Sequence, residues 1–161
     1  MLNQNFIDML SAFLDEKVEF LIVGGIAMAF HGYVRGTGDI DFWIRISDDN
    51  AERVWRALRR FGAPTFDLEK KDLLIKGTVF QIGVIPNRID IINSIEGVEF
   101  EEAWPTRNIA VFEDLRIPTI SKPLLLKNKR ATGRPKDQID VLWIEKRPET
   151  DTNLIDEDIA T

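Results

Sequence analysis

The stretch from residue 20 to residue 45 constrains the fold of this chain more than any other. An apolar run ends at Gly24-Gly25, a short segment rich in Ala and Met follows, and Gly38-Asp39-Ile40-Asp41-Phe42 comes next. From Asp39 to Ile44, branched or aromatic residues alternate with the two acids, which predicts a strand with one face in the core. Because side chains two residues apart in a strand share a face, Asp39 and Asp41 are expected together on the opposite face.

Two carboxylates this close repel each other, and each raises the pKa of the other unless a cation neutralises them. A hard divalent ion such as Mg²⁺ takes oxygen ligands of this kind. An Asp-x-Asp pair alone is nevertheless common on exposed strands and turns, so the pair needs further support before it indicates a metal site.

The glycine pair falls between a predicted strand over residues 18–23 and a predicted helix over residues 26–30 that Gly32 closes. There the backbone can approach a ligand without a Cβ in the way, and the N–H groups of a helix start favour an anion such as phosphate. On the residues alone, a tight structural turn remains the more common reading of Gly-Gly.

Asp90 is the third acid of interest, on a short predicted strand over residues 88–92. It is flanked by Ile89, Ile91 and Ile92. An acid in such an apolar segment is costly unless it is ion-paired, hydrogen-bonded, exposed on the polar face of its strand or bound to a metal.

Hydrophobic periodicity predicts the remaining elements. Helices are expected over residues 3–16, after Ser47 as far as Gly62, over residues 94–104, from Ser121 to Gly133 and over residues 137–146. Strands are expected over residues 109–112 and 116–120, together with a pair over residues 73–75 and 79–85 joined around Lys76-Gly77-Thr78.

The 161 residues fit one domain with a small helical appendage. The absence of Cys excludes disulfides, thiolate zinc sites and a cysteine nucleophile, and we expect a soluble cytoplasmic protein without a membrane contact. A formal net charge of −6 argues against a general nucleic-acid coat, although a basic patch from Lys122 to Lys136 could hold an RNA end locally. Much of the excess acid lies in residues 149–161, which predicts a flexible tail.

These segments carry a family resemblance. Val23-Gly24-Gly25, the run from Arg35 to Phe42 and Arg88-Ile89-Asp90 resemble the nucleotidyltransferase fold of the DNA polymerase β superfamily, over about residues 18–92. The run from Lys129 to Asp137, with Asp140, is similar to the C-terminal element of small bacterial nucleotidyltransferases akin to abortive-infection toxins, although the helical part is shorter here.

The resemblance implies an α/β (α+β) chain with a mixed β-sheet flanked by helices. We expect a nucleotidyltransferase core over residues 1–120, a C-terminal helical element packed on it over residues 121–147, and an acidic flexible tail over residues 148–161. Asp39, Asp41 and Asp90 are implied as catalytic residues that hold Mg²⁺ or Mn²⁺, with Asp90 also helping to deprotonate the acceptor hydroxyl.

The residues implied as nucleotide ligands are Gly24, Gly25, Arg35, Lys129, Arg134 and Lys136. Basic side chains are usually solvated surface groups. A solvated position without a ligand role therefore stays the alternative interpretation of Arg35, Lys129, Arg134 and Lys136. Asp137 and Asp140 are interpreted as helix-face partners of Arg134 or Lys136 in preference to a second metal site.

Two roles, one functional and one structural, are considered for each of His31, Trp43 and Trp55. The single histidine could touch nucleotide or acceptor, but a structural or exposed role is favoured. The two tryptophans are interpreted as packing residues and not as base-stacking platforms, because aromatic side chains dominate protein cores.

The function predicted in this way is Mg²⁺-dependent transfer of a nucleoside monophosphate from an NTP, with ATP the expected donor, to a hydroxyl on a protein, an RNA end or a small molecule. The alternative is a nucleotide-binding or partner-binding module on the same fold that performs no turnover. The resemblance further suggests a toxin–antitoxin component, with an antitoxin or regulatory protein as partner.

Overall fold

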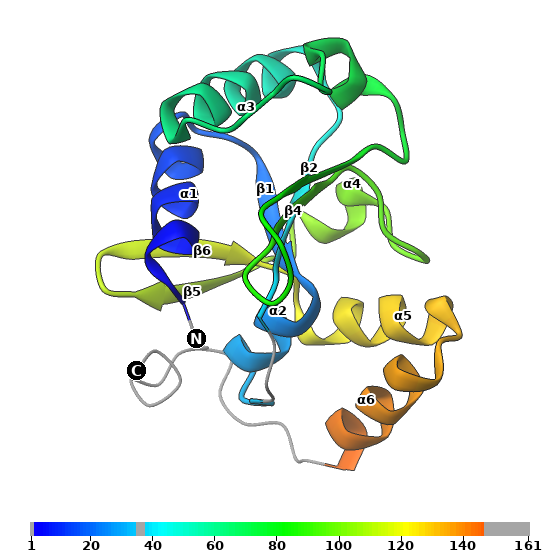
Figure 1. Ribbon diagram of the computed structural model, residues 1–161. Helices are drawn as coiled ribbons and strands as arrows, with labels where there is room; N and C mark the ends of the chain where they lie inside the picture. Colours follow the sequence, from blue (N-terminus) through cyan, green and yellow to red (C-terminus); the bar gives the residue numbers. More distant parts are fainter. Residues whose placement is uncertain (1, 35–37, 147–161) are drawn as a thin grey trace.

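A computed structural model describes residues 2–34 and 38–146 of the chain. Its centre is a six-stranded mixed sheet in the order β3-β4-β2-β1-β6-β5 (Figure 1). The strands are β1 (Phe20–Val23), β2 (Ile40–Ile44), β3 (Val79–Ile82), β4 (Ile89–Ile92), β5 (Asn108–Phe112) and β6 (Leu115–Thr119). β2 runs antiparallel to β1 and parallel to β4, whereas β1 is parallel to β6. The mixed α+β class is therefore confirmed.

One face of the sheet carries the main aromatic core. Phe13, from helix α1 (Gln4–Asp15), lies against Phe20 and Phe42 with ring centroids 5.2 and 4.8 Å away. Helix α3 (Asp48–Phe61) packs beside α1 over this face (Figure 1). The alternation predicted for residues 39–44 places Ile40, Phe42 and Ile44 in the core, and all three are buried.

The opposite face carries the acids and is covered only in part. Helix α2 (Gly24–Phe30) starts at the end of β1, and α5 (Lys122–Thr132) and α6 (Pro135–Lys146) form a hairpin beside it (Figure 1). The short helix α4 (Phe100–Ala103) presses Phe100 edge-on against Trp43, with ring centroids 5.1 Å apart. The acidic face thus has a floor, made by the sheet, and one wall, made by α5 and α6.

Local signals placed most helix ends correctly. Ser47 accepts a hydrogen bond from the backbone N–H of Asn50 at the start of α3, and Gly62 ends that helix in the left-handed conformation with φ of 84°. Ser121 precedes α5, with proline in its first turn, and Gly133 ends it with φ of 66°.

Two predicted elements are wrong. Residues 73–75 are not a strand: Lys70–Leu74 form a 3₁₀ helix (η1), and β3 ends at Ile82 and pairs with β4 instead. Residues 94–104 are helical only at α4, with an isolated bridge between Ile95 and Val98 before it. In both segments the contacts with the rest of the fold determined the local structure, and the short apolar pattern did not. The division into core, helical element and tail stays a prediction, and residues 147–161 lie outside the described residues.

Candidate active-site cleft

The parallel pairing of β2 with β4 brings two of the three acids together. Asp41 and Asp90 are register partners on these strands, so two carboxylates 49 residues apart in sequence become neighbours on one face of the sheet. Asp39 lies just before β2, and its Oδ1 accepts a hydrogen bond of 3.1 Å from the backbone N–H of Arg88. All three acids therefore meet at one end of the β2–β4 pair.

Arg88 is the cation nearest to these acids. Its Nε and one terminal nitrogen donate to the two oxygens of Asp90 over 2.7 and 3.1 Å, and a terminal nitrogen lies 3.6 Å from Asp39 Oδ2. A two-pronged guanidinium–carboxylate pair of this geometry is among the stronger charged contacts in proteins. Arg88 thus holds Asp90 in place, and among residues 2–34 and 38–146 no Lys or Arg forms an ion pair with Asp41.

Asp41 shows the electrostatic consequence. Burial, followed by the negative charge of Asp90, a hydrogen bond with Asp90 and the charge of Asp39, raises the pKa of Asp41 to about 7, and the opposing effect of Arg88 is smaller. The carboxyl is therefore close to half-protonated at neutral pH. A bound divalent cation would favour its ionised form, because an adjacent positive charge stabilises the carboxylate.

Gly24 is required where β1 meets α2. Its φ is +71°, and a Cβ at this position would lie 2.2 Å from Oδ2 of Asp41. Any side chain would therefore displace the carboxylate as well as strain the backbone. The predicted glycine turn is closely packed against the acid pair, which explains how a structural turn can also shape the site.

A second charged cluster faces the acids from α5 and α6. Lys129 Nζ lies 2.9 Å from Asp140 Oδ2 and 3.3 Å from Asp137 Oδ1, and only 6% of the lysine is exposed. Thr132 donates to the other oxygen of Asp137 over 2.6 Å. Although burial opposes the effect, this hydrogen bond and the charge of Lys129 lower the pKa of Asp137. The cluster joins the two helices.

Both clusters line one cleft with a volume of about 460 Å³. The cleft collects eight of the nine residues proposed from the sequence: Gly24, Gly25, Asp39, Asp41, Asp90, Lys129, Arg134 and Lys136. The ninth, Arg35, lies outside the described residues. Tertiary structure thus places the predicted ligands around one volume, and the individual roles of these residues stay predictions.

The basic residues differ in their availability to a ligand. Lys129 is buried between two carboxylates, so it reaches a phosphate only by giving up part of that pairing. Arg134 is exposed and lies 3.7 Å from Asp137 and 3.8 Å from Glu96, distances typical of loose surface pairs. The predicted pairing of Arg134 with Asp137 is present, whereas the main partner of Asp140 is Lys129.

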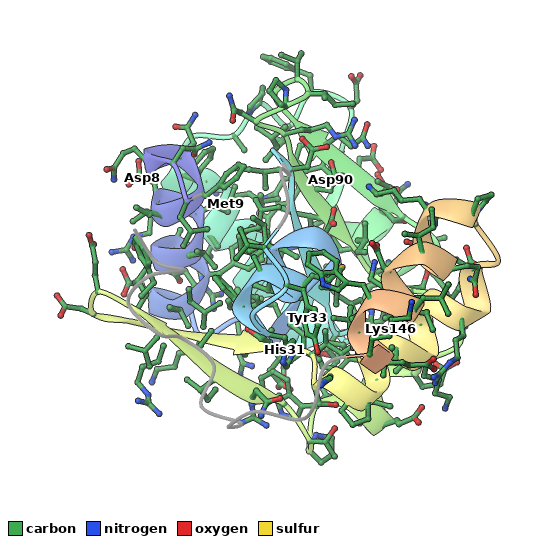
Figure 2. The ribbon with its side chains drawn as sticks, turned by 90° about the horizontal axis from the view of Figure 1, so that it is seen from below. Asp8, Met9, His31, Tyr33, Asp90 and Lys146 are labelled. Atoms are coloured by element: carbon green, nitrogen blue, oxygen red, sulfur yellow. The ribbon has the colours of Figure 1, made fainter. Side chains whose placement is uncertain are left out.

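Sequence reasoning gave Arg88 no role in the site. One signal was available, because Arg88 and Asp90 are two residues apart in an extended segment and such side chains project to the same face. His31 has a structural position: its Nε2–H donates to the carbonyl of Ile120 over 2.7 Å, and burial lowers its pKa. Figure 2 shows it well away from Asp90. Trp43 is buried and Trp55 packs against the core, as expected.

The carboxylates of the cleft fit a hard divalent cation only if the phosphates of a substrate supply further ligands. Among residues 2–34 and 38–146, no group of three or more His, Cys, Asp or Glu side chains is arranged to hold a metal ion. Mg²⁺, however, commonly binds through one or two carboxylates plus waters and substrate phosphates. Asp41 and Asp39 provide such carboxylates, and a cation would offset both the burial and the neighbouring negative charges that raise the pKa of Asp41.

Searches against protein-family models and against curated proteins found no match to this chain. Among solved structures, the chain is similar to a protein of Thermotoga maritima described as a "putative nucleotidyltransferase". The two share 16% sequence identity with a TM-score of 0.54, over 91% of this chain and 97% of the other. The likeness shows that this chain has a nucleotidyltransferase fold. In the described part of the chain, no helix is long and apolar enough to cross a membrane.

Proposed function

We propose that the protein is a Mg²⁺-dependent nucleotidyltransferase that moves a nucleoside monophosphate from an NTP to a hydroxyl and releases pyrophosphate. The observation that carries the proposal is the meeting of Asp39, Asp41 and Asp90 with Gly24 and with the basic end of α5 and α6 in one cleft. A single fold can host more than one activity, so the site residues, and not the fold alone, support this function.

In the proposed reaction, the acceptor oxygen forms a bond to the α-phosphorus, and the bond from that phosphorus to the β-phosphate bridging oxygen breaks. The proton of the hydroxyl passes to one of the neighbouring carboxylates, Asp41 or Asp90, which face the same cleft. Bound Mg²⁺ would supply charge neutralisation at the α-phosphate and the leaving pyrophosphate.

The remaining residues position the nucleotide. Gly24 and Gly25 let the triphosphate approach the backbone, and Arg134 and Lys136 provide positive charge near the leaving group. Arg88 positions Asp90 through two hydrogen bonds. Such positioning and electrostatic stabilisation are what phosphoryl-type transfers chiefly require from a protein.

The test incubates purified protein with each labelled NTP, Mg²⁺ or Mn²⁺, and separate protein, RNA and small-molecule acceptor pools. We expect label in one pool and a loss of about a thousandfold or more in Asp41→Asn, because both metal binding and proton transfer are removed. Asp49→Asn, on α3 outside the cleft, is the matched control and should transfer normally. If wild type and Asp41→Asn bind metal–nucleotide equally and neither labels any pool, the enzyme proposal must be dropped.

One observation favours a second candidate, a nucleotide-binding module without turnover. Both oxygens of Asp90 already accept hydrogen bonds from Arg88, and a metal ion would have to compete with that guanidinium for them. In that case metal–nucleotide binding is saturable, and no label transfer is detected from any NTP.

The toxin–antitoxin role remains a proposal founded on the resemblance of the run from Lys129 to Asp137. Expression of the chain alone should slow growth, Asp41→Asn should abolish the effect, and co-expression of a protein encoded next to it should relieve the effect. Normal growth at a verified level of the wild-type protein would contradict this role.

A further inference from the structure

The sheet face that carries the acids continues past them to Trp43. Side chains at positions i and i+2 of a strand share a face, so Asp41 and Trp43 of β2 lie on one face. On β4 the same holds for Asp90 and Ile92, and Trp43 is the register partner of Ile92. The indole therefore stands one step along the strands from the carboxylate pair, about 7 Å by strand geometry.

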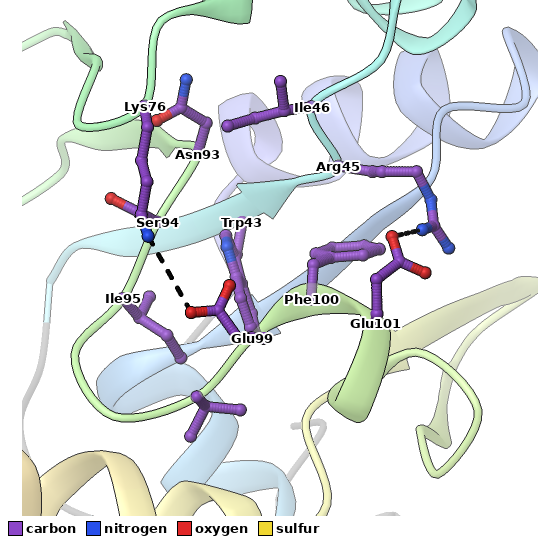
Figure 3. Close-up of a pocket in the computed structure, with 11 residues that line it drawn as sticks. Trp43, Arg45, Ile46, Lys76, Asn93, Ser94, Ile95, Glu99, Phe100 and Glu101 are labelled. Carbon is purple, nitrogen blue, oxygen red and sulfur yellow. Dashed lines mark hydrogen bonds and ion pairs between the residues drawn. The ribbon is translucent and has the colours of Figure 1, made fainter.

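Two hollows connect these positions. One, of about 480 Å³, shares Gly24, Asp41, Lys129 and Arg134 with the acidic cleft and passes over Ile92. A smaller one, of about 150 Å³, shares Lys76, Ser94 and Ile95 with the first and is lined at its far side by Trp43 (Figure 3). The shared lining residues make the hollows one groove that leads away from the proposed reaction centre.

The far end of the groove presents one hydrogen-bond donor that the fold does not use. Within residues 2–34 and 38–146, the indole Nε1–H of Trp43 is the buried side-chain group that lacks a hydrogen-bond partner, and Trp43 is only 1% exposed. Its neighbour Asn93 is fully engaged, accepting from the backbone of Gly77 and Thr78 and donating to two carbonyls. A buried donor left unpaired costs free energy, which an oxygen of a ligand would recover.

The charges around this end balance. Lys76 Nζ lies 3.8 Å from Glu99, and Arg45 donates to Glu101, as Figure 3 shows. Arg45 also donates to Glu19, which lies 3.7 Å from Arg53 as well. Apolar side chains, Ile46, Ile95, Val98 and Phe100, form much of the remaining wall. A volume of 150 Å³ greatly exceeds the ~15 Å³ that one water needs. The pocket therefore suits an uncharged organic group with an acceptor oxygen.

The other end of the cleft has a different character, with the exposed cations Arg134 and Lys136 beside the acids. The triphosphate, with several negative charges, belongs at that end. Glu96 lies near Arg134 and Glu99 lies near Lys76, so the groove has no surplus of positive charge with which to hold the phosphates of an RNA polymer.

We infer that the groove is the acceptor site and that the acceptor is a small uncharged molecule, which places its hydroxyl at Asp41–Asp90 and a carbonyl-type oxygen against the Trp43 indole N–H. This inference rests on the proposed nucleotidyl transfer and narrows its acceptor class. Trp43 is then a specificity-determining residue, because its indole N–H binds the acceptor at a distance from the reacting atoms.

The binding test uses the full chain labelled with ¹⁵N at its four tryptophans, and Trp43→Phe assigns the Trp43 indole signal. The probes are 4-hydroxybenzamide and N-(2-hydroxyethyl)benzamide, with 4-hydroxybenzoate as the matched charged analogue, and neither Mg²⁺ nor NTP is added. We expect a saturable shift of the Trp43 N–H signal with at least one amide, and at least fivefold weaker binding of the benzoate. No saturable shift at Trp43 with either amide, or equal binding of the benzoate, overturns the pocket assignment.

A kinetic test then asks whether the pocket serves transfer. With a labelled acceptor recovered from the small-molecule pool, Trp43→Phe should raise its KM at least fivefold and leave kcat and the KM for NTP within twofold. Trp55→Phe, the same change on α3 outside the groove, is the matched control. Transfer confined to RNA or protein, unaffected by Trp43→Phe, overturns this inference and leaves the proposed function standing. Saturable amide binding without any transfer instead removes the proposed function and the acceptor role together, and leaves a pocket for a neutral ligand.

Discussion

Two charged clusters face each other across the cleft, and their charge balance differs. At β2 and β4, the three carboxylates share one guanidinium among the described residues, and burial together with the charges of Asp90 and Asp39 raises the pKa of Asp41 to about 7. On α5 and α6, Lys129 is enclosed by Asp137 and Asp140, while Thr132 and Arg134 supply further positive or donor contacts. We call the first cluster incomplete, because among the described residues its carboxylates outnumber its cations, whereas the charges of the second are paired within the fold.

This difference in charge balance distinguishes residues suited to bind a ligand from residues that stabilise the fold, although both kinds were predicted as ligands from the sequence. Asp39, Asp41 and Asp90 retain unneutralised charge at a cleft surface, which is the condition for taking up a metal–nucleotide. The charge of Lys129 is instead paired with Asp137 and Asp140, and these pairs join α5 to α6. The following changes test this contrast, from the largest expected effect to the smallest.

Breaking the satisfied cluster should have the largest effect on stability. Asp140→Asn leaves Lys129 buried without its nearest carboxylate, and removal of one partner of a buried pair typically costs about 3–5 kcal/mol. Urea denaturation should therefore show a loss of about 3 kcal/mol in the free energy of unfolding. Lys129→Met combined with Asp140→Leu should recover most of it. A loss below about 1 kcal/mol would mean that the lysine is free to serve a phosphate.

Neutralising an acid of the incomplete cluster should raise the free energy of unfolding instead of lowering it. The pKa of Asp41 rises from 3.8 to about 7 on folding, so the native state binds more protons than the unfolded chain between these values and stability falls as pH rises through them. Asp41→Asn removes that penalty and should stabilise the metal-free protein by about 2 kcal/mol at pH 8. At pH 3.5 the gain should vanish. Asp49→Asn is the control, and destabilisation by Asp41→Asn at pH 8 would show that the carboxylate is well paired.

The same titration should appear in ligand binding. Because a metal ligand must be deprotonated, Mn²⁺–ATP should bind about tenfold more weakly at pH 6 than at pH 8 if the carboxyl of Asp41 titrates near 7. Isothermal titration calorimetry at the two pH values measures this ratio, and repeating it in buffers of different ionisation enthalpy detects the proton that binding releases to the buffer. A ratio near one in the wild type would separate Asp41 from the metal.

The smallest expected effect concerns the single guanidinium of the acidic cluster. Arg88→Gln removes a positive charge 2.7 Å from Asp90, so Mn²⁺ without nucleotide should bind about threefold to fivefold more tightly, a gain of roughly 1 kcal/mol. The Mn²⁺ electron paramagnetic resonance signal reports the free ion directly. Arg60→Gln, which removes a cation paired with Asp15 and Glu16 away from the cleft, should leave the affinity unchanged. Weaker Mn²⁺ binding in Arg88→Gln would show that positioning of Asp90 outweighs charge competition.

Much of the fold followed from local patterns. Alternation over residues 39–44 gave the correct core face, and the cap at Ser47 and the glycine stops at Gly62 and Gly133 marked helix ends. The errors fell on residues 73–75 and 94–104, where an apolar pattern of a few residues does not distinguish a strand or helix from a loop packed against the core.

By itself the sequence determined which side chains share a face of each element, because the period of a strand or helix is a local property of the backbone. It therefore identified the pair Asp39 and Asp41, the glycine turn and the third acid. Only the tertiary structure decided that Asp41 and Asp90 would be register partners, that Arg88 would hold Asp90, and that Lys129 would be buried in an ion pair. Charge balance, desolvation and an unpaired indole N–H depend on distances between segments far apart in the chain, which no local pattern contains.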